Sequence, residues 1–485
     1  MDEIVLVAYF ISLSILFLFG CHGFVMLYYH RKYGKALPVS KPGLNEDSTV
    51  TIQLPLYNEL YVVERLINSV CDIDYPKNKL EIQVLDDSTD ETTNIVATVV
   101  NAKQNEGFDI QHIRRGTREG FKAGALKEGL KIAKGEYIAI FDADFIPHSN
   151  FLKKTLSFFT NENIGMVQTR WEHLNSDYSI LTKAQALALD GHFVIEQSVR
   201  NKAGFFINFN GTGGVWRKSC IEDAGNWHAD TLTEDLDLSY RAQLNGWKFI
   251  FLKDFTSPAE LPSEINALKS QQFRWTKGAI ETAKKILPLV WRSNLPLRVK
   301  LQSTFHLTNN FAFPFILLAA ILNVPLIFIK NSGPHEVYFA VMSIFVLAFI
   351  SSFLFYLYSQ KDIRDDWRKK IVLFPLFMAG SMGFAVNNSR AVFEGLMNRK
   401  SEFIRTPKYK VEKNGDSWVG KKYFTKKLDL STIVELIMAV YCLVGIISSI
   451  YFLEFAALPF QFLFFTGFAF VSYTSIKHAF ATAKG

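Results

Sequence analysis

Apolar and polar positions divide the chain into three parts. Residues 4–29 form an uncharged apolar run that is long enough to span a bilayer. Between residues 50 and 141 short apolar runs alternate with amphipathic segments, and beyond residue 300 long apolar stretches return, separated by basic loops. This pattern predicts an α/β domain inserted between membrane-spanning helices.

Four apolar runs in the middle part have the length of buried β-strands. They are residues 50–56, 80–86, 108–113 and 137–141, with helical segments after Asn58, after Thr89 and over residues 120–133. Alternating strands and helices predict a mostly parallel, doubly wound sheet. Ligands of such a sheet bind beyond the carboxyl ends of its strands.

The apolar stretches predict five membrane crossings, at residues 4–29, 305–329, 338–358, 432–453 and 456–473. Loops 359–370 and 398–427 are both basic, so both are expected on the cytoplasmic side. The stretch between them, 371–397, is therefore expected to lie in the interface or to re-enter without crossing. Residues 176–203 and 264–290 are also expected as interfacial helices. The predicted domains are an anchor at 1–30, a cytoplasmic domain at 31–300 and a membrane region at 301–485.

Composition agrees with this division. Apolar side chains make up 49% of the chain and charged ones 20%, which excludes both an ordinary soluble enzyme and a protein lying wholly in the membrane. The four cysteines have no C-x-x-C spacing and predict neither a disulfide framework nor zinc. The net charge of +7 comes with basic residues beside apolar spans, which favours a membrane surface over nucleic acid as the partner.

Two carboxylates follow the fourth predicted strand. Asp142 and Asp144 are spaced i, i+2, so at a strand end they point the same way. Acids are common in turns, and the pair could simply terminate the strand. It also suits Mg²⁺ or Mn²⁺ shared with a diphosphate. Polar groups at the ends of the first two strands favour a site: Pro55, Tyr57, Asn58 and Glu59, then Asp86 and Asp87.

Basic residues and glycines precede that strand. Residues 114–126 contain neither a Walker motif nor G-x-G-x-x-G, so they support neither a P-loop nor a dinucleotide fingerprint. Small residues and basic side chains at a helix N-terminus favour a bound anion. A diphosphate held by Lys122, by one of the arginines and through a metal on Asp144 fits this segment.

Two later motifs carry further polar groups. Thr233, Glu234 and Asp235 open a predicted helix, where the acids could serve only to complement the helix dipole. Trp275 lies in a segment rich in Lys, Arg and apolar residues, where it could be an interfacial anchor.

Taken in order, the motifs resemble those of the processive family 2 glycosyltransferases, the cellulose synthase superfamily. They are P-x-Y-N-E at 55–59, D-D at 86–87, D-A-D at 142–144, T-E-D at 233–235 and Q-x-x-R-W at 271–275. The longer stretches 120–129 and 209–217 are more similar to the cellulose synthase-like A and C branch of mannan, glucomannan and xyloglucan-backbone synthases. The resemblance implies a glycosyltransferase A-type, Rossmann-like fold and inverting β-transfer from a nucleotide sugar.

The resemblance also implies roles for single residues. The donor would be bound by Pro55, Tyr57, Glu59, Asp86, Asp87, Lys122, Asp142, Gln271 and Arg274, and the metal by Asp144 and Asp142. Asp235 would be the general base, with Glu234 beside it, and the acceptor sugar would lie against Trp275, Gly211 and Thr212. Residues 398–412 contain a segment similar to the family's gating loop F-x-V-T-x-K, with Phe403, Thr406 and Lys408 matching and Arg405 in place of valine.

These observations predict a membrane-embedded, processive hexosyltransferase that makes a β-1,4-linked polysaccharide. Its expected partners are the nucleotide-sugar donor, the growing glycan and the bilayer, and its expected location is a bacterial plasma membrane. Two alternatives stay open: transfer of a single sugar to a lipid such as ceramide or polyprenyl phosphate, and an inactive scaffold. The donor, UDP-glucose or GDP-mannose, and any export partner also stay open.

Overall fold

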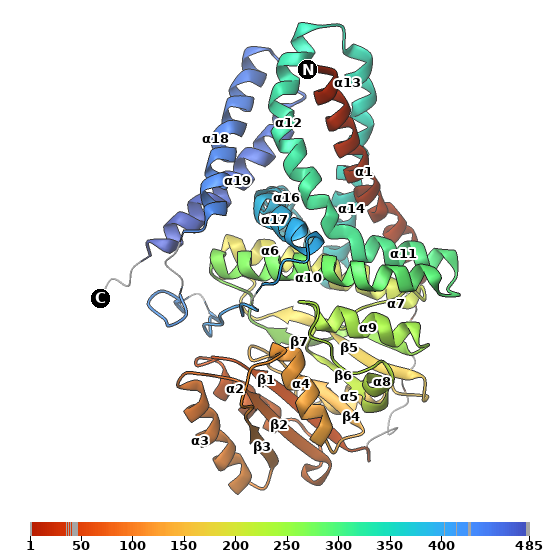
Figure 1. Ribbon diagram of the computed structural model, residues 1–485, viewed down its shortest axis with the longest axis vertical. Helices are drawn as coiled ribbons and strands as arrows, with labels where there is room; N and C mark the ends of the chain where they lie inside the picture. Colours follow the sequence, from red (N-terminus) through yellow and green to blue (C-terminus); the bar gives the residue numbers. More distant parts are fainter. Residues whose placement is uncertain are drawn as a thin grey trace.

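A computed structural model describes residues 2–34, 36, 38, 40, 47–401, 403–413, 415–424 and 428–481. A sheet with flanking helices forms one end of the molecule, upright helices form the other, and two helical layers lie flat between them (Figure 1). The N-terminal helix α1 (Asp2–Tyr33) stands among the upright helices.

The sheet contains seven strands in the order β3-β2-β1-β4-β6-β5-β7. Strand β6 runs antiparallel to its two neighbours, and the other neighbouring pairs are parallel. The predicted α/β, Rossmann-like fold is therefore confirmed. The strands are β1 (Val50–Leu56), β2 (Leu80–Asp86), β3 (Asp109–Ile113), β4 (Tyr137–Ile140), β5 (Ile164–His173), β6 (Gly214–Arg217) and β7 (Lys248–Ala259).

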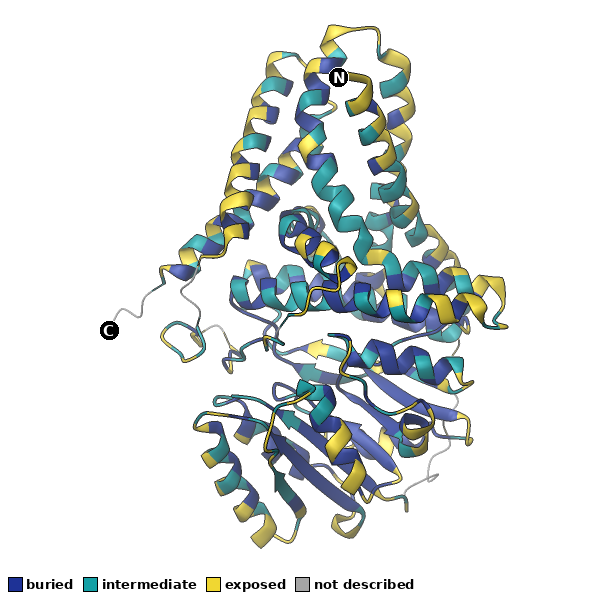
Figure 2. Ribbon diagram, viewed as in Figure 1, coloured by how far each residue is buried: buried dark blue, intermediate teal, exposed yellow. Residues whose placement is uncertain are grey.

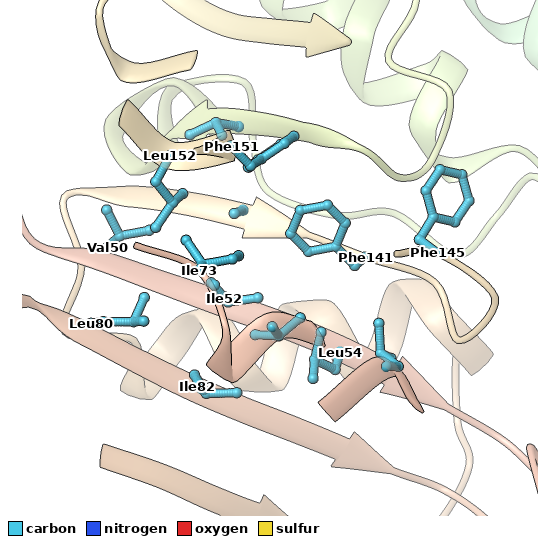
Figure 3. Close-up of a cluster of buried hydrophobic side chains, with 14 of the residues drawn as sticks. Val50, Ile52, Leu54, Ile73, Leu80, Ile82, Phe141, Phe145, Phe151 and Leu152 are labelled. Carbon is cyan, nitrogen blue, oxygen red and sulfur yellow. The ribbon is translucent and has the colours of Figure 1, made fainter. Parts of the chain in front are cut away.

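Helices cover both faces of the sheet, which is why its central strands consist almost entirely of buried residues. One face packs against α2 (Val63–Cys71), α3 (Thr92–Asn105) and α5 (Phe151–Leu156), and the other against α4 (Phe121–Ile132), α8 (Lys218–Asp223) and α9 (Glu234–Leu244). Figure 3 shows the first of these cores, where Phe141 and Phe151 close over the aliphatic side chains of β1 and β2.

The topology gathers several strand ends at one rim. The carboxyl ends of β1, β2 and β4 lie together because these strands are parallel. Since β6 is antiparallel to β4, the loop that enters β6 reaches the same rim, with Gly214 opposite Ile140. The backbone N–H of Asp142 consequently donates a 2.9 Å hydrogen bond to Thr212 Oγ1.

Two flat helical layers cover this rim (Figure 1). The first is a continuous run made of α6 (Ile180–Asp190), the π-helical segment η2 (Gly191–Gln197) and α7 (Ser198–Lys202). The second is α10 (Ile265–Arg292), whose N-cap Glu264 accepts hydrogen bonds from the N–H groups of Asn266 and Ala267. These are the segments for which the sequence predicts interfacial helices.

Within the part of the chain that the structure describes, four helical stretches are long and apolar enough to cross a membrane: Asp2–Tyr33, Leu297–Ser332, Glu336–Ile363 and Leu430–Tyr451. A fifth is possible if Trp367–Gly383 and Ala385–Leu396, which meet at a 46° bend, are one broken span. Figure 2 shows exposed residues along the outer face of α18 (Leu430–Tyr451), and these include Ile433, Ile437 and Ile447. Apolar side chains exposed in this density suit contact with lipid.

The remaining helices complete the upright part. They are α11 (Leu297–Thr308), α12 (Ala312–Ser332), α13 (Glu336–Met342), α14 (Val346–Ile363), α15 (Trp367–Ile371), α16 (Phe374–Gly383), α17 (Ala385–Leu396) and α19 (Leu458–Ala479), with short 3₁₀ turns at Lys77–Lys79, Asn309–Phe311 and Ser343–Phe345. Helix α19 covers most of the predicted span 456–473. It is not among the four stretches named above, because polar residues such as the buried Gln461 and Ser472 lower its mean hydropathy. Helices α16 and α17 lie across the upright helices, in the stretch expected not to cross (Figure 1).

A buried ion pair joins the flat and the upright helices. Lys269 Nζ on α10 lies 2.9 Å from Glu435 Oε2 on α18 and 3.2 Å from Thr432 Oγ1. The amide of Asn387 on α17 donates to the backbone oxygen of Lys269 at 3.1 Å. Three helices therefore meet at one polar node.

We expect Lys269→Met to destabilise the protein by about 3–5 kcal/mol, because it leaves Glu435 buried without its partner. The double variant Lys269→Met with Glu435→Leu should recover most of that loss, since a buried ion pair and a packed apolar pair differ little in stability. Thermal unfolding in detergent micelles measures both variants. A double variant no more stable than the single one would contradict this account of the node.

Candidate active site

A cavity of about 180 Å³ lies between the rim of the sheet, helix α10 and the segment after α17. It brings together side chains that are more than 300 residues apart in the sequence. Of the residues singled out from the sequence, those that line it are Pro55, Tyr57, Glu59, Asp87, Lys122, Asp142, Asp144, Gly211, Glu234, Asp235, Gln271, Arg274, Trp275, Phe403, Thr406 and Lys408.

Asp86 and Thr212 do not line the cavity but lie behind its wall. Asp86 is buried, accepts a 2.9 Å hydrogen bond from the N–H of Ser88, and lies 2.9 Å from His112 Nε2. Thr212 is buried beneath the D-x-D turn and holds its backbone. Both side chains shape the rim and do not face the space that a ligand could fill.

A lysine neutralises each carboxylate of the D-x-D pair. Lys122 Nζ donates to Asp142 Oδ1 at 2.6 Å and to the backbone oxygen of Gly211 at 2.9 Å. Lys408 Nζ donates to Asp144 Oδ2 at 2.6 Å and to the backbone oxygen of Glu260 at 2.8 Å. The two carboxylates give this rim of the sheet negative charge, and the two ammonium groups balance it.

The oxygen atoms around Asp144 fit a hard divalent cation. Asp142 and Asp144 supply carboxylates, the ligands that Mg²⁺ and Mn²⁺ prefer. Two further carboxylates, those of Glu59 and Glu260, are buried in the same wall, and each has one oxygen without a hydrogen-bond partner. Asp142 and Asp144 therefore supply the ligand type required by the metal that the sequence motif predicts.

Glu234 and Asp235 lie in the first turn of α9 and line the cavity. The N–H of Leu236 donates to Asp235 Oδ1 at 2.8 Å and fixes the orientation of that carboxylate. Burial, reinforced by the adjacent charge of Glu234, raises the pKa of Asp235 to about 7. Burial also raises the pKa of Glu234. A carboxyl group with such a pKa can accept a proton near neutral pH.

Gly211 is required beside Asp235 by its backbone and by space. Its φ of 80° lies in the left-handed region, and a Cβ built on it would come within 3.0 Å of Asp235 Oδ2. The glycine at this position therefore allows the backbone to approach the carboxylate closely.

Tyr57, Asp87 and Arg118 also line the cavity, and Arg115 lies behind Asp87. The guanidinium of Arg118 lies 3.3 Å from the centre of the Tyr57 ring. Arg115 makes a two-point ion pair with Asp87, with Nε 2.9 Å from Oδ1 and Nη2 bonded to Oδ2. A planar base can stack against such a surface while the arginines balance nearby negative charge.

Residues 403–413 and 415–424, here called the strap, contribute Phe403, Arg405, Thr406 and Lys408 to the cavity wall; Glu402 and Asn414 lie outside the described residues. Phe403 stacks on Phe121, with ring centres 5.6 Å apart, and the guanidinium of Arg274 lies 4.5 Å from the Phe403 ring centre. Near the C-terminal end of the strap, Tyr423 bonds to Asp90, shortly after β2. The strap therefore contacts α10 with its first residues and the segment after β2 with its last ones.

Several cavity residues were not singled out from the sequence. Trp171 and His173 come from the end of β5, and Glu260 follows β7. Both strands contribute their carboxyl ends to the same rim, since β5 and β7 are parallel. The apolar pattern predicts no strand in these stretches, so it could not place their ends at the site.

Comparison with known proteins agrees with the fold and the motifs. Residues 48–278 match the family described as "Glycosyltransferase like family 2". The probable glucomannan 4-beta-mannosyltransferase 7 of Oryza sativa subsp. japonica is 45% identical over 249 residues, which cover 50% of this chain and 43% of the relative. The probable glucomannan 4-beta-mannosyltransferase 10 of Arabidopsis thaliana is 34% identical over 375 residues, covering 74% of this chain and 65% of the relative. The chain spans about half the length of most of the curated relatives it matches.

A solved structure shares the fold. It is the mannosyltransferase PcManGT from Pyrobaculum calidifontis in complex with GDP-Man and Mn²⁺, with a TM-score of 0.56, 19% identity, and coverage of 80% of this chain and all of that chain. At this identity the similarity concerns the fold alone.

The fold, the ordered motifs and the family match define a family 2 glycosyltransferase domain with a glycosyltransferase A-type fold. Within that class, the chain is similar to the glucomannan mannosyltransferases, the branch whose motifs the sequence resembles.

Proposed function

We propose that this protein is an inverting β-glycosyltransferase of the membrane that extends a β-1,4-linked polysaccharide from a nucleotide-sugar donor. The observation that supports this proposal most directly is a shared cavity. The D-x-D carboxylates, Asp235 and the Q-x-x-R-W residues of α10 all line it. GDP-mannose is the first donor to test, because the similar plant proteins are named mannosyltransferases. UDP-glucose, used in the same branch, is the second.

The proposed reaction is a single displacement. The acceptor hydroxyl oxygen attacks the anomeric carbon, its proton passes to the carboxylate of Asp235, and the bond from that carbon to the diphosphate breaks. Attack from the side opposite the leaving group converts an α-linked donor into a β-linked product. Trp275 offers a ring on which the acceptor sugar can stack.

Cationic groups stabilise the departing diphosphate. Lys122 lies beside Asp142, and Arg274 lines the same wall. Asp144, with Asp142, would hold a divalent cation, Mg²⁺ or Mn²⁺, which when bound neutralises charge on the leaving group. Such preorganised positive charge is a large part of transfer catalysis.

The test is incorporation of labelled sugar by purified protein with Mn²⁺ or Mg²⁺. GDP-mannose, UDP-glucose and UDP-N-acetylglucosamine are compared, and the product is sized and digested with linkage-specific enzymes. A long β-1,4 polymer from one donor supports the proposal and names the sugar. A single sugar on an extractable lipid would replace it with lipid glycosylation, and the absence of both transfer and donor hydrolysis would leave an inactive scaffold.

We expect the transfer rate to fall as the pH drops through about 7, because the raised pKa leaves Asp235 protonated below that value. A protonated carboxyl group cannot take the acceptor proton, whereas above this pKa the base is ready. Initial rates at saturating donor, measured between about pH 5.5 and 8.5, report this ionisation. A rate that stays constant down to about pH 5 would contradict a base with this pKa.

We further propose that the catalytic domain and the basic loops lie on the cytoplasmic side of a membrane. The long apolar helices support membrane association, while the matched plant proteins give no support for the predicted bacterial membrane. With Gly333→Cys and Gly415→Cys variants, an impermeant thiol reagent applied to intact cells should label position 333 only. Labelling at 415 would overturn this topology.

A further inference from the structure

Arg405 is the position at which the strap departs from the family's loop pattern. Its Nη1 lies 2.9 Å from Glu59 Oε2, and its guanidinium lies 4.2 Å from the centre of the Tyr423 ring. The side chain is 12% exposed and lines the cavity. Valine, which the family's loop pattern carries at this position, could make neither contact.

The contact with Glu59 leaves Arg405 incompletely satisfied. Neither Nη1 nor Nη2 of Arg405 makes a hydrogen bond of acceptable geometry, although both are buried. Glu59 Oε2 likewise has no hydrogen-bond partner. A buried guanidinium with free N–H groups lacks an acceptor.

The position of Arg405 indicates which acceptor fits. Lys408, three residues further along the strap, reaches Asp144 at 2.6 Å, and Arg405 itself reaches Glu59, two residues after Tyr57. The charge of Arg405 also acts on Arg118, whose guanidinium lies over the Tyr57 ring. Arg405 is therefore near both the carboxylate expected to hold the metal and the tyrosine expected to hold the base. A nucleoside diphosphate bound across the cavity would have its phosphates there, and two phosphate oxygens match the fork of a guanidinium.

We propose that Arg405 is a donor-binding residue that leaves Glu59 and pairs with the diphosphate when a nucleotide enters. This inference rests on the proposed function, since it names a further residue of the same site. The contact would also hold the strap against an occupied site, because the strap itself carries a cation that pairs with the leaving group.

Binding of pyrophosphate, GDP and UDP in the presence of Mn²⁺ tests the proposal by calorimetry on the full chain in detergent. Arg405→Val should weaken pyrophosphate and the bound nucleotide by about tenfold or more, because a charge-assisted two-point contact is lost. Binding of the matching nucleoside, which lacks phosphate, should not change. Arg405→Lys should recover part of the affinity, since it keeps the charge but not the fork.

The matched control is Lys413→Gln, which removes one positive charge from an exposed part of the same strap. It should leave pyrophosphate binding unchanged. If Lys413→Gln weakened binding as much as Arg405→Val, the effect would be one of net charge, and the proposal would fail.

Tyr423→Leu separates phosphate binding from bracing of the strap, because it removes the bond to Asp90 and the ring beside Arg405 but keeps the guanidinium. If Arg405 acts on the diphosphate, Tyr423→Leu keeps most of the pyrophosphate affinity that Arg405→Val loses. If Arg405 only braces the strap, both variants weaken pyrophosphate alike, and the inference is overturned. Wild-type protein that binds neither nucleotide would instead overturn the proposed function, whereas equal nucleotide binding by wild type and Arg405→Val overturns this inference alone.

Discussion

Asp235→Asn is expected to slow sugar transfer by about 10²- to 10⁴-fold, the range that general-base catalysis contributes. The substitution keeps the size of the side chain, and the asparagine can still accept the hydrogen bond from the Leu236 N–H, so the first turn of α9 should survive. An amide cannot take the proton of the acceptor hydroxyl. Donor binding should stay within a few fold of wild type, because we expect the donor's phosphates to lie against Lys122 and Arg274 and not against Asp235.

The turnover number at saturating donor and the affinity for the nucleotide are measured on the same preparation. Asp230→Asn is the matched control, since Asp230 is an exposed carboxylate of the preceding loop whose partner is Lys285, outside the cavity. It should leave both quantities unchanged. Turnover retained in Asp235→Asn would remove Asp235 from the role of base and direct attention to Glu234, the other carboxylate of the same turn.

The sequence was sufficient for the part of the site built on local pattern. Each of β1, β2 and β4 is a short run of apolar residues that ends in polar ones, and a parallel sheet brings such ends together. Tyr57, Asp87 and Asp142 could therefore be placed at one rim from the order of apolar and polar residues alone. The parallel topology alone predicts that these three side chains lie close together.

The remainder of the site depends on long-range contacts that no local sequence pattern predicts. Strands β5 and β7 are long, and their pairing contains register shifts, so their ends could not be read from an apolar run. The segment at Arg405 has no regular periodicity, yet it meets Glu59 across the cavity. Asp86 and Thr212 show the converse: their motifs were recognised, but the direction in which each side chain points is set by neighbours such as His112.

The membrane part was predictable in outline for a similar reason. Long apolar runs mark α1, α12, α14 and α18 because lipid-facing residues need no partner. Helix α19 buries Gln461 against α18, where a Cβ on Gly445 would come within 2.6 Å of its side chain. Packing between helices therefore decides which polar residues an upright helix can contain, and hydropathy alone does not capture that.

Asp144→Asn is the second substitution with a large expected effect. Asp144 is 5% exposed and, with Asp142, supplies the carboxylate oxygens expected to bind the metal. Replacing the carboxylate by an amide removes a negative charge from the expected metal site, so Mn²⁺ affinity should fall by at least about tenfold. Transfer should fall by at least about a hundredfold, because the leaving diphosphate loses its main counter-charge.

Lys408, which lies beside Asp144, allows a second prediction with the opposite sign. Lys408 Nζ lies 2.6 Å from Asp144 Oδ2, so an ammonium group and a divalent cation compete for the same carboxylate. Lys408→Met should therefore tighten Mn²⁺ binding in the absence of nucleotide, the opposite sign to Asp144→Asn. Titration of Mn²⁺ followed by electron paramagnetic resonance measures both, with Asp74→Asn, an exposed carboxylate paired to Lys153, as control. If Asp144→Asn and Lys408→Met changed Mn²⁺ affinity in the same direction, or if Asp144→Asn left it intact, the metal would have to bind elsewhere in the cavity.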